Sequence, residues 1–146
     1  MATARTPTPV RAFGIALALP LVVIGVWARI TPRGWFEDFP GFGPALAAAE
    51  PPYNEHLVTD VAAGFLAIGV LLLGACLLGG PAEMRLAAAG YALFGLPHLV
   101  YHAAHPSSLL STSGNVLNVV LLAAQVAGGI LLIVLTNHRK AAAWAS

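Results

Sequence analysis

The sequence contains very few charged residues for its length. Only 9% of its 146 residues are Asp, Glu, Lys or Arg, whereas 58% are hydrophobic. A water-soluble domain needs roughly a quarter of its residues charged to keep its surface hydrated. This shortage excludes a soluble globular protein and indicates that most of the surface faces lipid. The net charge of +1 is too small to attract nucleic acid, so we expect no nucleic-acid partner.

Cysteine is also nearly absent. The one cysteine, Cys76, lies in an apolar run, so the chain cannot form an internal disulfide, and the residue says nothing about the redox compartment. No CxxCH motif is present, which excludes covalently attached haem, although two facing histidines could still hold one. Glycine-rich phosphate loops and nucleophile elbows are missing as well.

Four apolar stretches account for most of the chain. Each has about 17 to 22 residues, enough to cross a hydrocarbon core of ~30 Å at 1.5 Å per residue. Because backbone groups in lipid must bond within their own segment, we expect these stretches to be helices. They run from about Ala12 to Ala28, Leu57 to Leu78, Leu86 to Ala104 and Val116 to Thr136. The sequence therefore predicts an all-α, four-helix transmembrane bundle that forms a single domain over residues 1–146.

The first apolar stretch also resembles a secretory signal, because Arg5 and Arg11 precede it. Trp27, just before Ala28, is too bulky for a good cleavage site, and no soluble domain follows. We therefore expect this segment to be kept as a membrane span, with cleavage as the alternative.

Basic residues predict the orientation of the bundle, because cytoplasmic loops of membrane proteins are enriched in Lys and Arg. With four spans, both termini lie on one side, and His138 is part of its basic flank. The other side carries only Arg29 and Arg33. The basic residues on the side of the termini are Arg5, Arg11, Arg85, Arg139 and Lys140. We expect cytoplasmic termini, in a multi-pass protein of the bacterial inner (cytoplasmic) membrane.

The segment from Ile30 to His56 is expected to face outward, together with the loop from Pro106 to Asn115. Aromatic rings favour the headgroup level of a bilayer, so this segment predicts an interfacial cap across the bundle, with substrate gating as a second interpretation. Its aromatic, proline and glycine residues are Trp35, Phe36, Phe39, Pro40, Gly41, Phe42, Gly43 and Pro44.

The second and third spans carry polar residues near their outer ends. Gly79-Gly80-Pro81 provides the turn between them, so residues equally distant from this turn are expected at the same depth. In that register His56 faces His105, Asp60 faces the Tyr101-His102 turn, and Ala63 faces His98. Deeper in the membrane, Ala67 faces Phe94 in the same register.

Helical spacing supports a shared site. His98, His102 and His105 are four and three positions apart, which puts them on one face of a helix. His56 and Asp60 are four apart and share a face as well. Polar residues of the fourth span are also expected to point into the bundle or a wet cavity, because polar groups are costly in lipid. These are Asn115, Asn118 and Gln125.

Such a cluster suits a transition metal. Neutral imidazole is a common ligand of zinc, copper and iron, and carboxylate complements it in zinc and non-haem iron sites. An i, i+4 pair of histidines can reach one ion. We therefore predict a site for zinc, copper or iron near the outer face, with a possible redox role. Its expected ligands are His98, His102, His105, His56 and Asp60, with Glu55 as an alternate ligand or neighbouring base.

Two other interpretations of the cluster stay open. In the first, the polar residues form a structural or pH-sensitive lock between two helices. Asn54 would cap the second span, Glu55 would lie near the positive end of its dipole, and Pro106 would end the third span just after His105. In the second, the cluster relays protons or electrons.

Small residues predict close helix contacts, either within the bundle or between copies of the chain. They are Gly64, Gly69, Gly74, Ala124 and Gly128. Pro97 is expected to kink the third span just below His98, which could open space for an ion or a small ligand.

The layout resembles the DoxX-like group of small four-helix bacterial membrane proteins. The resemblance covers the topology, and the histidine cluster departs from the usual pattern of the group, so it implies the fold and assigns no activity or residue role. The motifs that carry it are Tyr53-Asn54-Glu55, Leu57-Val58-Thr59-Asp60 with Gly64 and Leu66, and the turn at Gly79. The string Pro97-His98-Leu99-Val100-Tyr101-His102 resembles actinobacterial membrane proteins.

These patterns predict a membrane protein that binds a transition metal, without assigning it a reaction. The alternative is a non-enzymatic accessory or scaffold subunit of a larger membrane complex. A transporter ranks third, because four short helices leave little room for a substrate path. The expected partners are the lipid bilayer and either other membrane subunits or further copies of the chain.

Overall fold

The computed structural model describes residues 6–143, and side chains up to residue 137. Arg5 and the side chains of His138, Arg139 and Lys140 lie outside this part. The described residues form five α-helices and no β-strand, which confirms the all-α prediction. The helices are α1 (Thr8–Ile30), α2 (Pro32–Asp38), α3 (Glu55–Leu78), α4 (Pro81–Ala104) and α5 (Thr112–Ala143).

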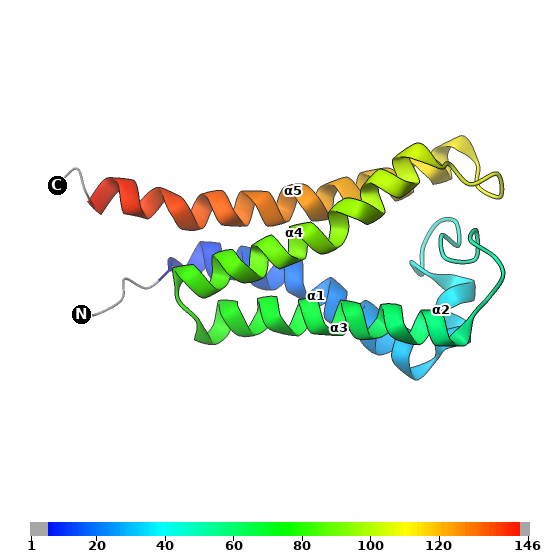
Figure 1. Ribbon diagram of the computed structural model, residues 1–146, viewed down its shortest axis with the longest axis horizontal. Coiled ribbons are helices and arrows are strands. Elements are labelled where there is room, and N and C mark those ends of the chain that lie inside the picture. The colour runs from blue at the N-terminus through cyan, green and yellow to red at the C-terminus, as the bar shows by residue number, and fades with distance from the viewer. Residues whose placement is uncertain (1–5, 144–146) are drawn as a thin grey trace.

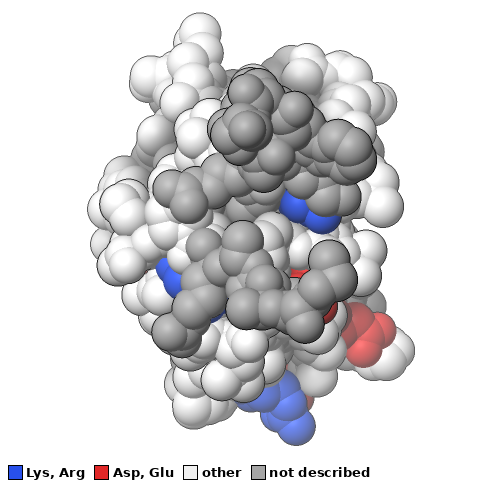
Figure 2. All heavy atoms as spheres, turned by 90° about the vertical axis from the view of Figure 1, so that its left-hand side faces the viewer, with Lys and Arg blue, Asp and Glu red and all other residues white. Residues whose placement is uncertain are grey.

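Three of the described helices, α1, α3 and α5, are long and apolar enough to cross a membrane. Large apolar side chains such as Val23, Leu71 and Ile130 are more than half exposed on them. Charged side chains are visible at the end of the molecule that carries the termini, as separate patches between uncharged residues (Figure 2). These helices are therefore suited to contact with lipid. Helix α4 is as long as α3 but less apolar, so it is not among the three.

Helix ends follow from local chemistry. The side chain of Asn54 accepts a hydrogen bond from the Leu57 N–H at 3.0 Å, which confirms the predicted cap of α3. At the start of α4, the Glu83 carboxylate accepts a hydrogen bond from the Gly80 N–H at 2.9 Å. At the other end, His105 follows the last residue of α4, and Pro106 comes next.

The long helices are arranged as two close pairs, α1 with α3 and α4 with α5 (Figure 1). In the first pair, Gly25 lies against the α3 backbone, where an added Cβ would be 2.9 Å from the Leu66 nitrogen and 3.0 Å from the Ala62 oxygen. Gly69 lies equally close to Val22. Without side chains at these glycines, the two backbones can approach each other directly.

The second pair uses the same device. A Cβ on Gly129 would be 2.9 Å from the Cβ of Ala92 and 3.1 Å from the Ala88 oxygen. Gly128 packs on Leu17, which links α5 to α1. Of the small residues noted in the sequence, Gly64, Gly69 and Gly128 make contacts within the chain, whereas Gly74 faces open space.

The predicted pairing of α3 with α4 is not observed at their outer ends. Phe94 contacts Gly64 and lies with its ring centroid 5.5 Å from that of Phe65, whereas the turn-based register placed it opposite Ala67. Beyond this level the two helices diverge toward the end opposite the chain termini (Figure 1). The reason is that each helix packs mainly on another partner, so consecutive helices do not pair along their full length.

The segment between α1 and α3 folds over this diverging end, which we call the loop end. It contains the short helix α2, which the sequence analysis missed although Pro32 is a typical first helical residue. Trp35 of α2 is only 7% exposed. Its ring centroid lies 5.1 Å from that of Phe39 and 6.5 Å from that of Phe65. The aromatic residues at these positions therefore pack inward.

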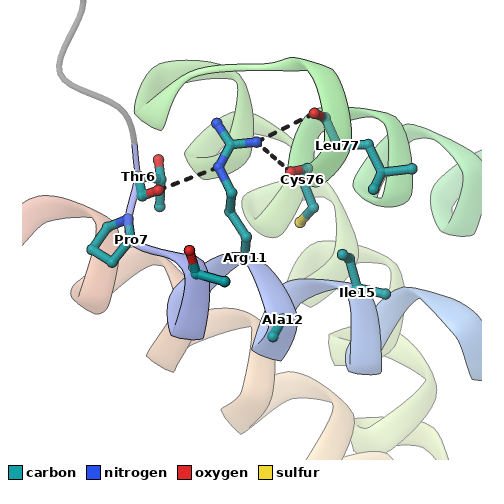
Figure 3. A pocket seen from close by; sticks show the side chains of 8 residues that line it. Thr6, Pro7, Arg11, Ala12, Ile15, Cys76 and Leu77 are labelled. Carbon is teal, nitrogen blue, oxygen red and sulfur yellow. Dashed lines mark hydrogen bonds between the residues drawn. The ribbon is translucent and has the colours of Figure 1, made fainter.

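Arg11 ties α1 to the other end of α3 (Figure 3). Its guanidinium donates hydrogen bonds to the carbonyl oxygens of Cys76 and Leu77, and to that of Gly79 at 2.7 Å. These are the last carbonyls of α3 and its cap, which lack partners inside the helix and carry partial negative charge. One arginine thus caps α3 and holds α1 beside it.

We expect Gly25→Ala to lower the thermal unfolding midpoint in detergent. The new methyl group meets backbone atoms of α3 that cannot move alone, and overpacking of this kind costs about 1–3 kcal/mol. Gly74→Ala is the matched control, because nothing lies within 4 Å of its Cβ position. Equal midpoints for the two variants would contradict the backbone contact at Gly25.

Candidate functional site

A cavity of about 720 Å³ lies between the two helix pairs and reaches the loop end. Leu57 and Val61 of α3 line it together with His98 and His102 of α4, so the two helices stand on either side of the space where they diverge. Helix α5 contributes Leu121 and Leu122 among others. Further apolar lining comes from α1 and the loop-end segment: Leu17, Leu21, Ile24, Phe36, Phe39 and Leu46.

Two histidines and one glutamate in the lining of this cavity form a cluster, His98–His102–Glu50. The ring centroids of His98 and His102 are 4.8 Å apart. The Nδ1 atom of His102 lies 3.8 Å from Oε1 of Glu50. The His102 side chain is 12% exposed and that of Glu50 44% exposed, so the cluster extends from the interior to the surface.

Each member of the cluster is placed by a different feature of the chain. His98 and His102 are one helical turn apart on α4, which puts their rings on the same face. Glu50 lies in the loop-end segment, where the neighbouring Ala49 oxygen accepts a hydrogen bond from Ser107 Oγ at 2.9 Å. Ser107 follows α4 in the loop to α5, so this bond ties the two loops together.

Asn115 holds that second loop. Its side-chain oxygen accepts from the Ser107 N–H at 2.9 Å, and its amide donates to the Ser107 carbonyl at 3.0 Å. Asn115 therefore bonds to the loop that precedes its own helix and is not part of the cavity lining, whereas Asn118 and Gln125 line the cavity.

The other predicted ligands lie elsewhere. His56 and Asp60 are 87% and 63% exposed, and their closest approach is to each other, at 3.6 Å. Exposed His105 stacks on Tyr101 with centroids 4.7 Å apart and has Nδ1 3.0 Å from the Tyr101 oxygen. Glu55 is exposed in the first turn of α3. Because α4 diverges from α3, the predicted facing of His56 with His105 and of Asp60 with His102 is not observed.

The chain shows no match in the comparisons with family models, curated proteins or solved structures. The DoxX-like resemblance therefore stays a prediction, and the function must be argued from the geometry of the site.

A metal ion needs several ligands around one point. No group of three or more His, Cys, Asp or Glu side chains within the described residues meets that condition. The His98–His102–Glu50 cluster contains two of the six predicted metal ligands, His98 and His102, and adds the carboxylate of Glu50.

Sequence reasoning missed Glu50. It is an acidic residue that directly follows the apolar run Ala45–Ala49, and this change in composition was the one feature of the sequence that could have indicated a functional role. No helical period includes it, because its segment contains turns and bends rather than a regular element. The bond between Ser107 and the Ala49 carbonyl is next to Glu50 in the chain and helps to hold it beside His102.

We expect Asn115→Ala to speed hydrogen exchange at the Ser107 amide by about fivefold, because one side-chain hydrogen bond contributes about 1 kcal/mol. The measurement is hydrogen–deuterium exchange in detergent, followed by mass spectrometry. Asn118→Ala is the control, since the Asn118 side chain makes no hydrogen bond within the described part of the chain. The same exchange rate in both variants would show that Asn115 does not hold the loop.

Proposed function

We propose that this chain is a four-span membrane protein that binds a small lipid-soluble molecule in the cavity between its helix pairs. The observation that carries the proposal is the cavity itself, of about 720 Å³ and largely apolar, with the side chains of Glu50, His98 and His102 in its wall. Ligand sites in proteins commonly have volumes of roughly 300–1,000 Å³, apolar walls and a few polar groups. The cavity fits this description.

In this proposal α4 also crosses the membrane. Its length of 24 residues equals that of α3. The residues that make it less apolar include His98 and His102, and both line the cavity, so they need not face lipid. Arg11 and Arg85 lie near the end of the molecule where α1 begins and α5 ends. Their position supports cytoplasmic termini in an inner membrane.

A transition metal is the second candidate ligand. It is favoured by the approach of two imidazoles and one carboxylate in the His98–His102–Glu50 cluster. These three residues would replace the six-residue set that the sequence suggested. The cavity could then hold a lipid-soluble molecule beside the ion.

Photolabelling tests the cavity. An alkyl diazirine added to the protein in liposomes should label peptides of α1, α3 and α5 that line the cavity, in addition to lipid-facing positions. Ala124→Phe places a ring in the cavity wall and should reduce cavity labelling to background. Ala127→Phe, on an exposed part of α5 outside the cavity lining, should leave cavity labelling unchanged.

Labelling at lipid-facing positions such as Leu131 provides the internal standard in both variants. Cavity peptides that stay unlabelled in the wild type, or that label equally in both variants, would refute the proposed binding.

Elemental analysis tests the metal. If the cluster binds an ion, purified protein contains zinc, copper or iron in stoichiometric amount, and His98→Ala/His102→Ala loses it. The matched double variant His56→Ala/His105→Ala should retain it, because both side chains lie outside the cluster. A metal-free wild type, or equal loss in both variants, would eliminate this candidate.

A further inference from the structure

A single carboxylate lies at one end of the apolar cavity. Glu50 is the only Asp, Glu, Lys or Arg among the described residues that line it. The lining around this carboxylate includes Pro52, Asn54 and Leu57, which lie at the loop end and at the start of α3. The rest of the wall is largely apolar. The cavity therefore carries an acidic group at its loop end.

The carboxylate of Glu50 is accessible to a ligand. Its side chain is 44% exposed, and its Oε1 atom lies 3.8 Å from Nδ1 of His102. Both residues line the cavity, so the carboxylate and the imidazole meet at its wall. A separation of 3.8 Å is too long for a hydrogen bond, which leaves the Oε1 atom free to accept one from a ligand. The bond from Ser107 to the Ala49 carbonyl holds the adjoining backbone.

The cavity continues from the loop end along α1. Its lining on this helix runs from Ala16 to Ile24, which is about 12 Å of helix at 1.5 Å per residue. Ile24 is nearer the loop end, where α1 ends, and Ala16 is farther from it. Leu17 and Leu21 line the space between these two levels. A long apolar space with one acidic group at its end suits an amphiphile that has an apolar chain and a polar head.

The head group that suits this end is a cation. A carboxylate only accepts hydrogen bonds and an ammonium only donates them, while a neutral imidazole has one nitrogen that accepts. An ammonium can therefore donate to Glu50 and to His102 at once. An anionic head would be repelled by Glu50, and no Lys or Arg among the described lining residues offsets that repulsion. A neutral hydroxyl would form weaker hydrogen bonds than an ammonium, because bonds between charged partners are the stronger ones.

We propose that the cavity binds an amphiphile with an ammonium head, which Glu50 recognises at the loop end. This inference rests on the proposed binding function and adds the chemical class of the ligand. The ammonium donates hydrogen bonds to the Glu50 carboxylate and the His102 ring, and the apolar chain lies along Leu17 and Leu21. Two sources supply such a head: a free alkylamine, and a phospholipid with a primary amine in its head group.

Competition against the alkyl diazirine tests the class of ligand. Four competitors of equal chain length are added at pH 8 and at equal mole fraction in the bilayer: undecylamine, undecanol, undecanoate and undecane. At this pH the amine is protonated, because the pKa of an alkylammonium is about 10. A hydrogen bond between charged groups is stronger than a neutral one, although the partial exposure of Glu50 reduces the gain. We expect undecylamine to displace the label from the cavity about fivefold better than undecanol, and undecanoate to compete less well than undecanol.

Variants of Glu50 test whether this residue selects the cation. Glu50→Gln removes the charge and keeps the size of the side chain, so undecylamine and undecanol should compete equally. Glu50→Lys should reverse the preference, so that undecanoate competes better than undecylamine, and a newly gained preference cannot result from a loss of fold. Glu55→Gln is the matched control, because Glu55 is exposed and does not line the cavity. Its amine advantage should equal that of the wild type.

Once the competition establishes the class, two bilayers separate the sources of the ammonium. An aminophospholipid occupant lowers cavity labelling in phosphatidylethanolamine relative to phosphatidylcholine, whereas a site for a free amine labels equally in both. If undecylamine and undecanol compete equally in the wild type, or if Glu50→Gln keeps the amine advantage, Glu50 does not select a cation. This inference then fails, while apolar binding stands. If the cavity is not labelled at all, the proposed function fails first.

Discussion

Close backbone contact at a few glycines determines the rest of this structure. Gly25 sets α1 directly against α3, and Gly129 sets α4 directly against α5. A helix whose face is occupied by one partner at such short distance cannot present the same face to another. Helices α3 and α4 are joined by a short turn yet separate above Phe94. The cavity is the space left between two pairs that are each packed internally.

The same arrangement explains where polar groups are tolerated in a chain with so little charge. His98 and His102 would be expensive on a lipid-facing surface, but on α4 they face the cavity. Two loops close that region, because Ser107 binds the Ala49 oxygen and Asn115 binds Ser107. His98 and His102 are therefore tolerated on α4 because the neighbouring helices and loops enclose the space that these side chains face.

Hydrophobic pattern and local signals located the four long helices, although each is longer than its predicted span and the short helix α2 was missed. The cap at Asn54 and the shared face of His98 and His102 depend only on residues close in sequence. Which helix packs against which cannot be predicted in this way, because it depends on contacts between glycines and backbone atoms that are far apart in the sequence. An antiparallel hairpin was therefore expected to pair along its length, and His56 was placed opposite His105. Glu50 escaped notice because a loop brings it to the site.

The observed geometry also bears on the interpretation of the cluster as a lock between helices. A lock needs bonds from one helix to the other, yet His56 pairs with Asp60 on its own helix, and His105 bonds to Tyr101 on its own. Among the described residues, no hydrogen bond between α3 and α4 offsets the cost of two imidazoles in this apolar wall, and the His102–Glu50 approach joins α4 to the loop-end segment instead. The buried indole nitrogen of Trp35 and amide nitrogen of Gln125, which have no hydrogen-bond partner among the described residues, add to that cost. His56 and His105 therefore form no lock between α3 and α4 in this geometry, whereas the proposed binding would use the polar groups of the cavity wall.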